Sequence, residues 1–303
     1  MKLKSILRFV GILLVALGVW YFFIKDYNYR VTFTSKQSRS IVFDHLVNWH
    51  DGRPASDSIV SLVKKQPFHH VVQDYSFGDS IFQIEWKLKM LDPNTTKVIA
   101  QVKDEQNSLS QNLNVLFTNN HFKQKSISTV EKFGKGLLKN AENYRLSEVR
   151  DSIIPAQKCA FISVKCKTQE KASAMLKNIF YVMNYIKGND EVELNGNPFL
   201  EVTQWDVEKD SIAFDFCFPI NEMESYPELP SNVSIKKTEE RKALKTIFNG
   251  NYRISDRAWY QLRDYADYNN IAVTNLPTEI FFNDPHEGTN SLEWVAEVFM
   301  PIQ

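Results

Sequence analysis

The chain has 303 residues, of which 36 are Lys or Arg and 36 are Asp or Glu, so it carries no net formal charge. Nucleic-acid binding depends on many phosphate-neutralising cations, and this balance argues against a nucleic-acid partner. Hydrophobic residues make up 43% of the chain and charged residues 24%, which argues against large-scale disorder. Since a single hydrophobic core stops growing at about 250–300 residues, the length favours more than one domain.

The first predicted element is a membrane anchor over residues 1–26. Residues 5–24 are apolar apart from Arg8, and about 20 such residues suffice to cross a bilayer. Arg8 can extend to the headgroups, while Trp20 and Tyr21 suit the opposite interface. A cleaved signal peptide is the alternative, but it would carry small residues where this run is aromatic.

Positive charge gathers before the span and predicts its orientation. Lys2, Lys4 and Arg8 lie at its start, whereas Lys25 after the span is offset by Asp26. Cytoplasmic flanks are richer in Lys and Arg. We therefore predict a single-pass protein with its N-terminus inside and its globular part outside the cytoplasm.

Residues 27–150 predict an α+β domain. Alternation of apolar and polar residues is clearest at 82–90, and the turn Asp92-Pro93-Asn94 joins this strand to the next as a hairpin. An apolar stripe at helical spacing predicts a long closing helix. The predicted strands are 27–34, 82–90, 96–102 and 113–118, and the predicted helices are 39–49 and 126–143.

This domain resembles the START-like polyketide-cyclase (SRPBCC) superfamily. The segments that carry the resemblance are VTFTSKQSRSIVFDHLVNW, IEWKLKMLDPNTTKVIAQVK and ISTVEKFGKGLLKNAENY. The resemblance implies a helix-grip fold, with an apolar cavity between a twisted sheet and the long helix, and hence lipid binding or transfer. The alternative is that side chains fill this space.

Cysteine and histidine spacing predicts no metal site and no cofactor. The three cysteines, Cys159, Cys166 and Cys217, include no Cys-x-x-Cys pair, and their odd number argues against a disulfide framework. His69 and His70 are adjacent on a strand, so their side chains point to opposite faces. We predict that they form a surface pair.

Residues 152–303 contain an internal repeat, over about residues 158–220 and 242–302. Each copy runs strand, helix, strand, strand and ends in Pro-Ile, at Pro219 and Pro301. Thr168 and Ser255 are candidate helix N-caps. The first helix is expected to bury Ala172, Met175, Leu176, Ile179, Met183 and Ile186, and the second Trp259, Leu262 and Ala266. Two such units related by a pseudo-two-fold leave a junction at which small-molecule pockets commonly lie.

The second half resembles the gyrase-inhibitory-protein-like domain, also known as the effector-binding domain of bacterial transcription activators. The segments that carry the resemblance are IFNGNY at 247–252, the helix with Ala258-Trp259, LPTEIF at 276–281 and WVAEVFMPI at 294–302. The resemblance implies a duplicated β-α-β-β fold that binds small hydrophobic, often cationic molecules. A transcription-factor role is not carried over, since a span and a START-like domain stand in place of a helix-turn-helix.

The resemblance also implies the site residues. Glu279 matches the ligand-contacting glutamate, and Glu297 matches a second acidic position, with Asp215 as its counterpart in the first copy. Aromatic side chains that could face a cation are Tyr252, Trp259, Tyr265, Phe281 and Trp294. The alternative is that Glu279 faces solvent and that these aromatics simply pack in the core.

The sequence therefore predicts a membrane-anchored small-molecule-binding protein that acts as a sensor, carrier or sequestering module. A hydrolase of a small reactive compound, with Glu279 as general base, is the alternative. No G-x-S-x-G, H-E-x-x-H or P-loop motif is present to support catalysis.

Overall fold

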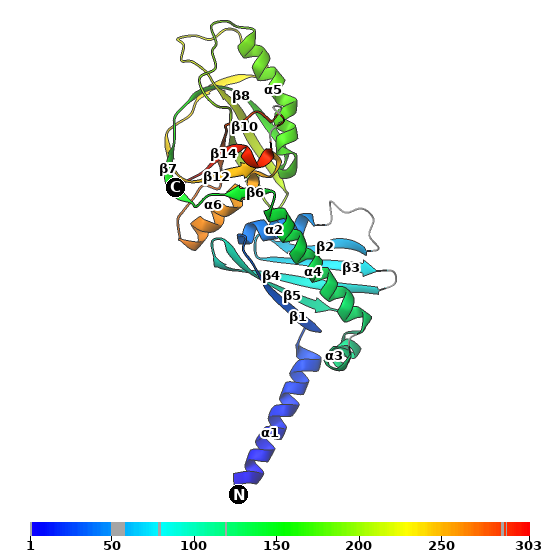
Figure 1. The fold of residues 1–303 in the computed structure, drawn as a ribbon. Coiled ribbons are helices and arrows are strands. Elements are labelled where there is room, and N and C mark those ends of the chain that lie inside the picture. The colour runs from blue at the N-terminus through cyan, green and yellow to red at the C-terminus, as the bar shows by residue number, and fades with distance from the viewer. Residues whose placement is uncertain (1, 50–57, 78–79, 119, 286–287, 289) are drawn as a thin grey trace. The chain divides into compact units, whose positions relative to one another are not determined.

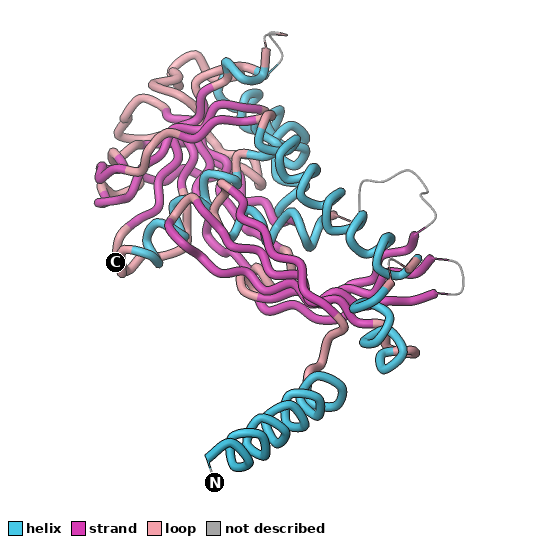
Figure 2. Tube along the Cα trace, turned by 60° about the horizontal axis from the view of Figure 1, so that its bottom comes forward, coloured by secondary structure: helices cyan, strands magenta, loops and turns pink. Residues whose placement is uncertain are grey.

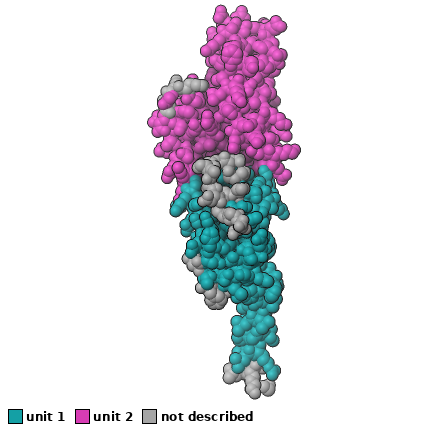
Figure 3. Space-filling view, turned by 90° about the vertical axis from the view of Figure 1, so that its right-hand side faces the viewer, with its two compact units in different colours: residues 1–91, 95–137 teal, residues 92–94, 138–303 magenta. Residues whose placement is uncertain are grey.

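The computed structural model describes residues 2–49, 58–77, 80–118, 120–285, 288 and 290–303. The chain divides into two compact units, one of residues 1–91 and 95–137 and the other of residues 92–94 and 138–303 (Figure 3). Each unit is built around an antiparallel sheet accompanied by helices (Figure 2). The chain is thus a mixed helix-and-sheet protein, as the α+β prediction expected.

The chain starts with the apolar helix α1 (Lys2–Val19), which continues as a π-helical turn η1 (Trp20–Ile24). Residues Ile6–Ile24 are long and apolar enough to cross a membrane, and none of this stretch is buried in the protein. A signal sequence passes the same test of length and composition.

The first unit contains a five-stranded sheet in the order β1-β5-β4-β3-β2 (Figure 1). The strands are β1 (Tyr29–Ser35), β2 (Ser58–Gln66), β3 (His70–Phe77), β4 (Ser80–Asp92) and β5 (Thr95–Lys103), and the helices are α2 (Arg39–Asn48), α3 (Ser108–Phe117) and α4 (His121–Ala141). The alternation predicted for the hairpin is confirmed, because Phe82, Ile84, Trp86 and Leu88 are all buried along β4.

An aromatic cluster packs between the middle of α4 and this sheet. Phe133 of α4 is fully buried and lies 4.8 Å from the Trp86 ring of β4 and 5.1 Å from the Trp49 ring, centroid to centroid. Val130 and Leu137 of α4 are buried beside it. In this part of the interface, side chains occupy the space between helix and sheet, as the alternative to a cavity expected.

One predicted strand is wrong. Residues 113–117 belong to the helix α3, and Thr118 is its C-cap. The apolar residues Leu113 and Val115 alternate over too short a run to distinguish a strand from a helix, and Leu109 one turn earlier completes a helical stripe. Strands β2 and β3 were not predicted. Of the adjacent histidines, His69 is exposed, and His70 Nε2 lies 2.8 Å from Glu85 Oε1.

The second unit contains nine strands, in the order β11-β8-β10-β9-β13-β14-β12-β6, with β7 also paired to β12. They are β6 (Tyr144–Leu146), β7 (Arg150–Ile154), β8 (Lys158–Lys167), β9 (Phe199–Asp206), β10 (Ser211–Pro219), β11 (Ser234–Lys237), β12 (Arg241–Gly250), β13 (Thr278–Phe281) and β14 (Val295–Pro301).

The order of the six inner strands is symmetrical about the β9–β13 pair. Outward from this pair, β9 is followed by β10 and β8, and β13 is followed by β14 and β12. Across this pair, Leu200 is the register partner of Glu279. The two Pro-Ile endings make corresponding contacts: Ile220 donates its backbone N–H to Lys158 at 2.9 Å, and Ile302 donates to Lys242 at 3.0 Å. Strands β8–β10 and strands β12–β14 thus lie on the two sides of the β9–β13 pair in one sheet.

The helices α5 (Lys171–Lys187) and α6 (Asp256–Tyr268) differ in how they pack. The predicted face of α6 is confirmed, since Trp259, Leu262 and Ala266 are buried. The prediction for α5 is largely wrong: Ile186 is buried, but Leu176 is 45% exposed and the other predicted core positions are only half-buried. The reason is a pocket on this face, described below.

Of the two predicted N-caps, Ser255 is at the N-cap position of α6, whereas Thr168 is not at that of α5. Thr168 begins the 3-10 turn η2 (Thr168–Glu170) ahead of α5. Ser255 is the residue before α6, but its side chain caps no backbone N–H of that helix. Its hydroxyl is instead directed to the Tyr252 carbonyl and to Glu279.

Gly250 at the end of β12 occupies a position that only glycine suits, because its φ is +156° and a Cβ there would lie 2.7 Å from the Phe248 ring. We expect Gly250→Ala to destabilise the protein by about 2–4 kcal/mol. Gly134→Ala in α4 is the control, because its Cβ would meet nothing within 4 Å; it should stabilise by about 0.5–1 kcal/mol. Urea unfolding of the detergent-solubilised chain measures both, and equal effects would contradict this account of Gly250.

Candidate functional site: a pocket beside a buried ion pair

A pocket of about 700 Å³ lies within the second unit. One wall is the face of α5, and the others are the ends of β10 and β13, the 3-10 turn η3 (Tyr252–Ile254) and the segment after β13. Most lining side chains are apolar or aromatic. The charged ones are Lys187, Arg253 and Asp284.

The α5 wall is the apolar stripe that the sequence predicted as core. Ala172, Met175, Leu176, Ile179 and Met183 all line the pocket. They recur at helical spacing, so they share one face of α5. The two methionines add flexible, polarisable surface that adapts to different shapes.

An aromatic wall brings together three of the predicted site residues. Tyr252, Phe281 and Trp294 all line the pocket. The Tyr252 ring lies 4.8 Å from that of Phe281 and 5.4 Å from that of Trp294, centroid to centroid. These residues are far apart in sequence, but β13 ends at Phe281 and β14 begins just after Trp294, and the start of β14 contacts Tyr252 of η3.

The Tyr252 side chain is held in place by its hydroxyl. It donates to the Val295 carbonyl at 2.8 Å and accepts from the Asn283 backbone N–H at 3.2 Å. Burial raises the pKa of Tyr252 to about 12, and the charge of Glu279 contributes to the increase. The hydroxyl therefore stays protonated at physiological pH and keeps the ring against the pocket.

Glu279 lies in a buried ion pair. Its side chain is 0% exposed, and Lys171 Nζ at the start of α5 lies 2.6 Å from its Oε1. The Ser255 hydroxyl donates to Oε2 at 2.8 Å and accepts from Lys171 at 2.6 Å. The carboxylate is thus neutralised by the protein's own cation, and Glu279 is not among the residues that line the pocket.

Trp259 supports the same pair from α6. Lys171 Nζ lies 4.5 Å from the centre of its ring, a distance typical of a cation–π contact. The Trp259 side chain is fully buried and is likewise absent from the pocket lining. The sequence pattern marked Glu279 and Trp259 together, but it contained no signal for Lys171, which is 108 positions from its partner.

Glu297 lies on the other face of the sheet. Its register partner is Ile280, which belongs to the core cluster with Phe199 and Cys217. Lys245 Nζ pairs with its carboxylate at 2.5 Å. The structure therefore separates Glu297 from the pocket, and ligand contact by Glu279, Trp259 and Glu297 stays a prediction.

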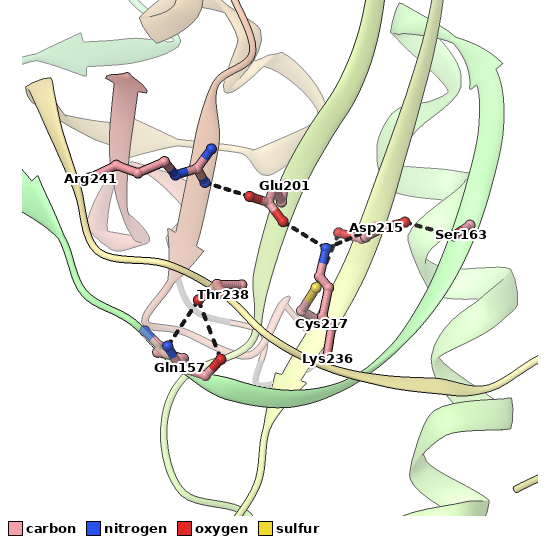
Figure 4. Close-up of polar contacts among 8 residues, drawn as sticks. All are labelled: Gln157, Ser163, Glu201, Asp215, Cys217, Lys236, Thr238 and Arg241. Carbon is pink, nitrogen blue, oxygen red and sulfur yellow. Dashed lines mark hydrogen bonds and ion pairs between the residues drawn. The ribbon is translucent and has the colours of Figure 1, made fainter. Parts of the chain in front are cut away.

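That face also carries an ionic network that the sequence did not indicate (Figure 4). Lys236 Nζ of β11 donates to Glu201 at 2.6 Å and to Asp215 at 2.5 Å, while Arg241 donates to the other oxygen of Glu201. Ser163 donates to Asp215 at 2.6 Å. A cavity of only about 10 Å³ adjoins the network. The network thus joins neighbouring strands, and this adjoining cavity is only about large enough for one water molecule.

The first unit has a smaller pocket of about 280 Å³. Its lining is mixed, with Phe82 and Phe122 beside the polar residues Asp104, Asn107 and Gln111. The Asp104 carboxylate accepts from the backbone N–H groups of Gln106 and Asn107 ahead of α3, at 3.1 and 2.9 Å. The Asp104 side chain therefore stabilises the turn that precedes α3.

Comparisons with known proteins give no family. No protein-family model matches the chain, and no curated protein matches it. Among solved structures, the EcmrR C-terminal domain is 19% identical with a TM-score of 0.44, covering 52% of this chain and 97% of that chain. SAV2435 bound to tetraphenylphosphonium is 11% identical with a TM-score of 0.38, covering 52% and 94%.

An uncharacterized conserved protein from Listeria innocua is 12% identical with a TM-score of 0.38, covering 56% of this chain and 98% of that chain. With TM-scores below 0.5 and identities below 20%, these likenesses assign neither a family nor a function to the chain.

The buried pair makes a prediction about stability. We expect Lys171→Met and Glu279→Gln each to destabilise the protein by about 3–5 kcal/mol, because each leaves a buried charge without its partner. The loss of unfolding free energy in the double variant should be smaller than the sum of the two single losses by about 2 kcal/mol or more. Urea unfolding of the solubilised chain measures the three variants, and additive effects would show that the two side chains do not interact.

Proposed function

We propose that the second unit binds a small, largely hydrophobic molecule in the pocket beside α5, and that the protein is a membrane-anchored sensor, carrier or sequestering module. The observation that carries the proposal is the apolar stripe of α5, which faces a pocket of about 700 Å³ instead of packing in the core. Ligand pockets commonly have volumes of about 300–1,000 Å³ and mostly apolar linings with a few polar groups.

The energetics favour an apolar occupant. Burial of apolar surface contributes about 25 cal/mol per Å², so a ligand that covers the α5 stripe and the aromatic wall gains most of its affinity there. Asn251 and Asn283 are pocket-lining amides that can orient a polar group of the ligand. We propose Tyr252, Phe281 and Trp294 as ligand contacts.

The charge of the ligand is the second part of the proposal. Aromatic faces attract cations, and the resemblance noted above implies hydrophobic cations. Because Lys171 already neutralises Glu279, however, a cationic ligand gains little from this carboxylate. We therefore propose that shape and apolar area dominate recognition, and that Glu279 and Trp259 position the pocket walls from behind.

We do not extend the proposal to catalysis. A general base must lie within hydrogen-bond reach of the proton it removes, directly or through one water. Glu279, the predicted base, is fully buried and its two oxygens are occupied by Lys171 and Ser255. No observation in the pocket favours a hydrolase.

We also propose the finer architecture on which this function rests. The inner strand order around the β9–β13 pair, with corresponding contacts of Ile220 and Ile302, supports a duplicated β-α-β-β unit. The contact of Phe133 on α4 with Trp86 on β4 supports a helix-grip arrangement of the START-like type in the first unit.

Filling the pocket tests the binding proposal. We expect Ile179→Trp to reduce the affinity for tetraphenylphosphonium at least tenfold, because the indole occupies the pocket. Phe180→Trp is the matched control: Phe180 adjoins Ile179 on α5 but is 62% exposed and outside the pocket lining. Calorimetric titration of the solubilised chain, with empty micelles as reference, measures both. Equal affinities of the two variants would contradict the proposed site.

A pair of probes tests the role of charge. Tetraphenylphosphonium and tetraphenylborate have nearly the same shape and opposite charge. If Lys171 neutralises Glu279, the double variant Lys171→Met/Glu279→Gln, which removes both charges together, should change the ratio of the two affinities less than about threefold. A tenfold loss of preference for the cation in this variant would show instead that the carboxylate acts on the ligand directly.

A further inference from the structure

The helix α3 exposes two large apolar side chains one helical turn apart. Leu109 is 56% exposed and Leu113 is 51% exposed, and their spacing of four places them on one side of the helix. Another side of α3 is anchored in the unit, where Asn112 is 1% exposed. Single exposed leucines are common on soluble proteins. Whether these two leucines contact a partner therefore depends on where α3 lies.

A hydrogen bond ties α3 to the apolar N-terminal helix. The Tyr21 hydroxyl donates to the backbone carbonyl of Asn112 at 2.9 Å. Tyr21 lies within the apolar stretch Ile6–Ile24, three residues before its end. At 1.5 Å per residue, Tyr21 is about 5 Å inside that end.

The buried residue Asn28 fixes α3 from the other side. Its Nδ2 donates to the Ser108 carbonyl at 2.8 Å and to Asn112 Oδ1 at 2.9 Å, and its Oδ1 accepts from the Asp104 N–H at 2.7 Å. Asn28 is only four residues beyond Ile24. The start and the middle of α3 are therefore both held at the end of the apolar stretch.

These contacts determine where α3 lies when the apolar stretch crosses a bilayer. The 19 residues of this stretch extend about 28 Å as a helix, close to the thickness of about 30 Å of the hydrocarbon core. The end near Tyr21 is then at the membrane surface, and α3 is at the same depth. We propose that α3 lies in the membrane interface, with Leu109 and Leu113 inserted among the lipid chains.

The composition of α3 specifies the kind of surface. Its sequence, SLSQNLNVLF, contains no charged residue. Binding of this helix thus draws on apolar burial and requires no anionic lipid. The proposed partner is a zwitterionic phosphatidylcholine-type surface, and the contact holds the adjacent end of β5 at the membrane.

Site-specific fluorescence tests the proposal in the full chain. The environment-sensitive NBD group is attached to a cysteine at position 109 or 113 in a Cys166→Ser background; the other two cysteines are fully buried. The labelled protein is reconstituted in phosphatidylcholine vesicles that contain lipid with a nitroxide near the headgroup. We expect at least twofold stronger quenching at 109 and 113 than at the control position.

Leu91 provides the matched control, with 44% exposure at the opposite end of the hairpin of β4 and β5. The nine residues of β5 separate it from the α3 end by about 30 Å. Phe23, within the apolar stretch, reports insertion. Quenching at 23 without quenching at 109 and 113 would overturn the proposal, and so would equal quenching at 91, 109 and 113. Absence of quenching at 23 would overturn it as well, because the span itself would lie outside the bilayer.

Discussion

The ion pair of Lys171 with Glu279 is the constraint on which the second unit depends. A carboxylate on the central strand β13 is fully buried and requires a partner, because burial of an unpaired charge is costly. The partner comes from the start of α5, and Ser255 ahead of α6 completes the arrangement. A single polar cluster thus connects the starts of both helices with the strand β13.

This anchoring explains how an apolar helix face can remain open. At one end α5 is held by Lys171, and towards the other end Val182, Tyr185 and Ile186 are buried. The stripe between these two attachments, from Met175 to Met183, faces the pocket. Collapse of the helix onto the sheet would require one of the attachments to move.

The two faces of the second sheet have different roles. The helix face carries the pocket and the buried pair, whereas the other face packs a core around Phe199, Cys217 and Ile280. On that face, Lys236 and Arg241 are paired with Glu201 and Asp215, and Lys245 is paired with Glu297. These ion pairs connect neighbouring strands, and the proposed ligand pocket lies on the helix face. In the first unit, an aromatic cluster around Phe133 packs between α4 and the sheet.

The sequence by itself determined the local features of this protein, because each depends on neighbours along the chain: the apolar N-terminal helix, the alternating hairpin of β4 and β5 and the buried face of α6. It also indicated the pocket aromatics Tyr252, Phe281 and Trp294. It misassigned 113–118, where a short apolar run suits strand and helix equally. Only the tertiary structure showed that Glu279 is buried in an ion pair. Its partner Lys171 lies 108 positions away, and no periodic pattern in the sequence encodes that contact. The open stripe of α5 was equally hidden, because a helix face that lines a pocket and one that packs in a core have the same apolar sequence.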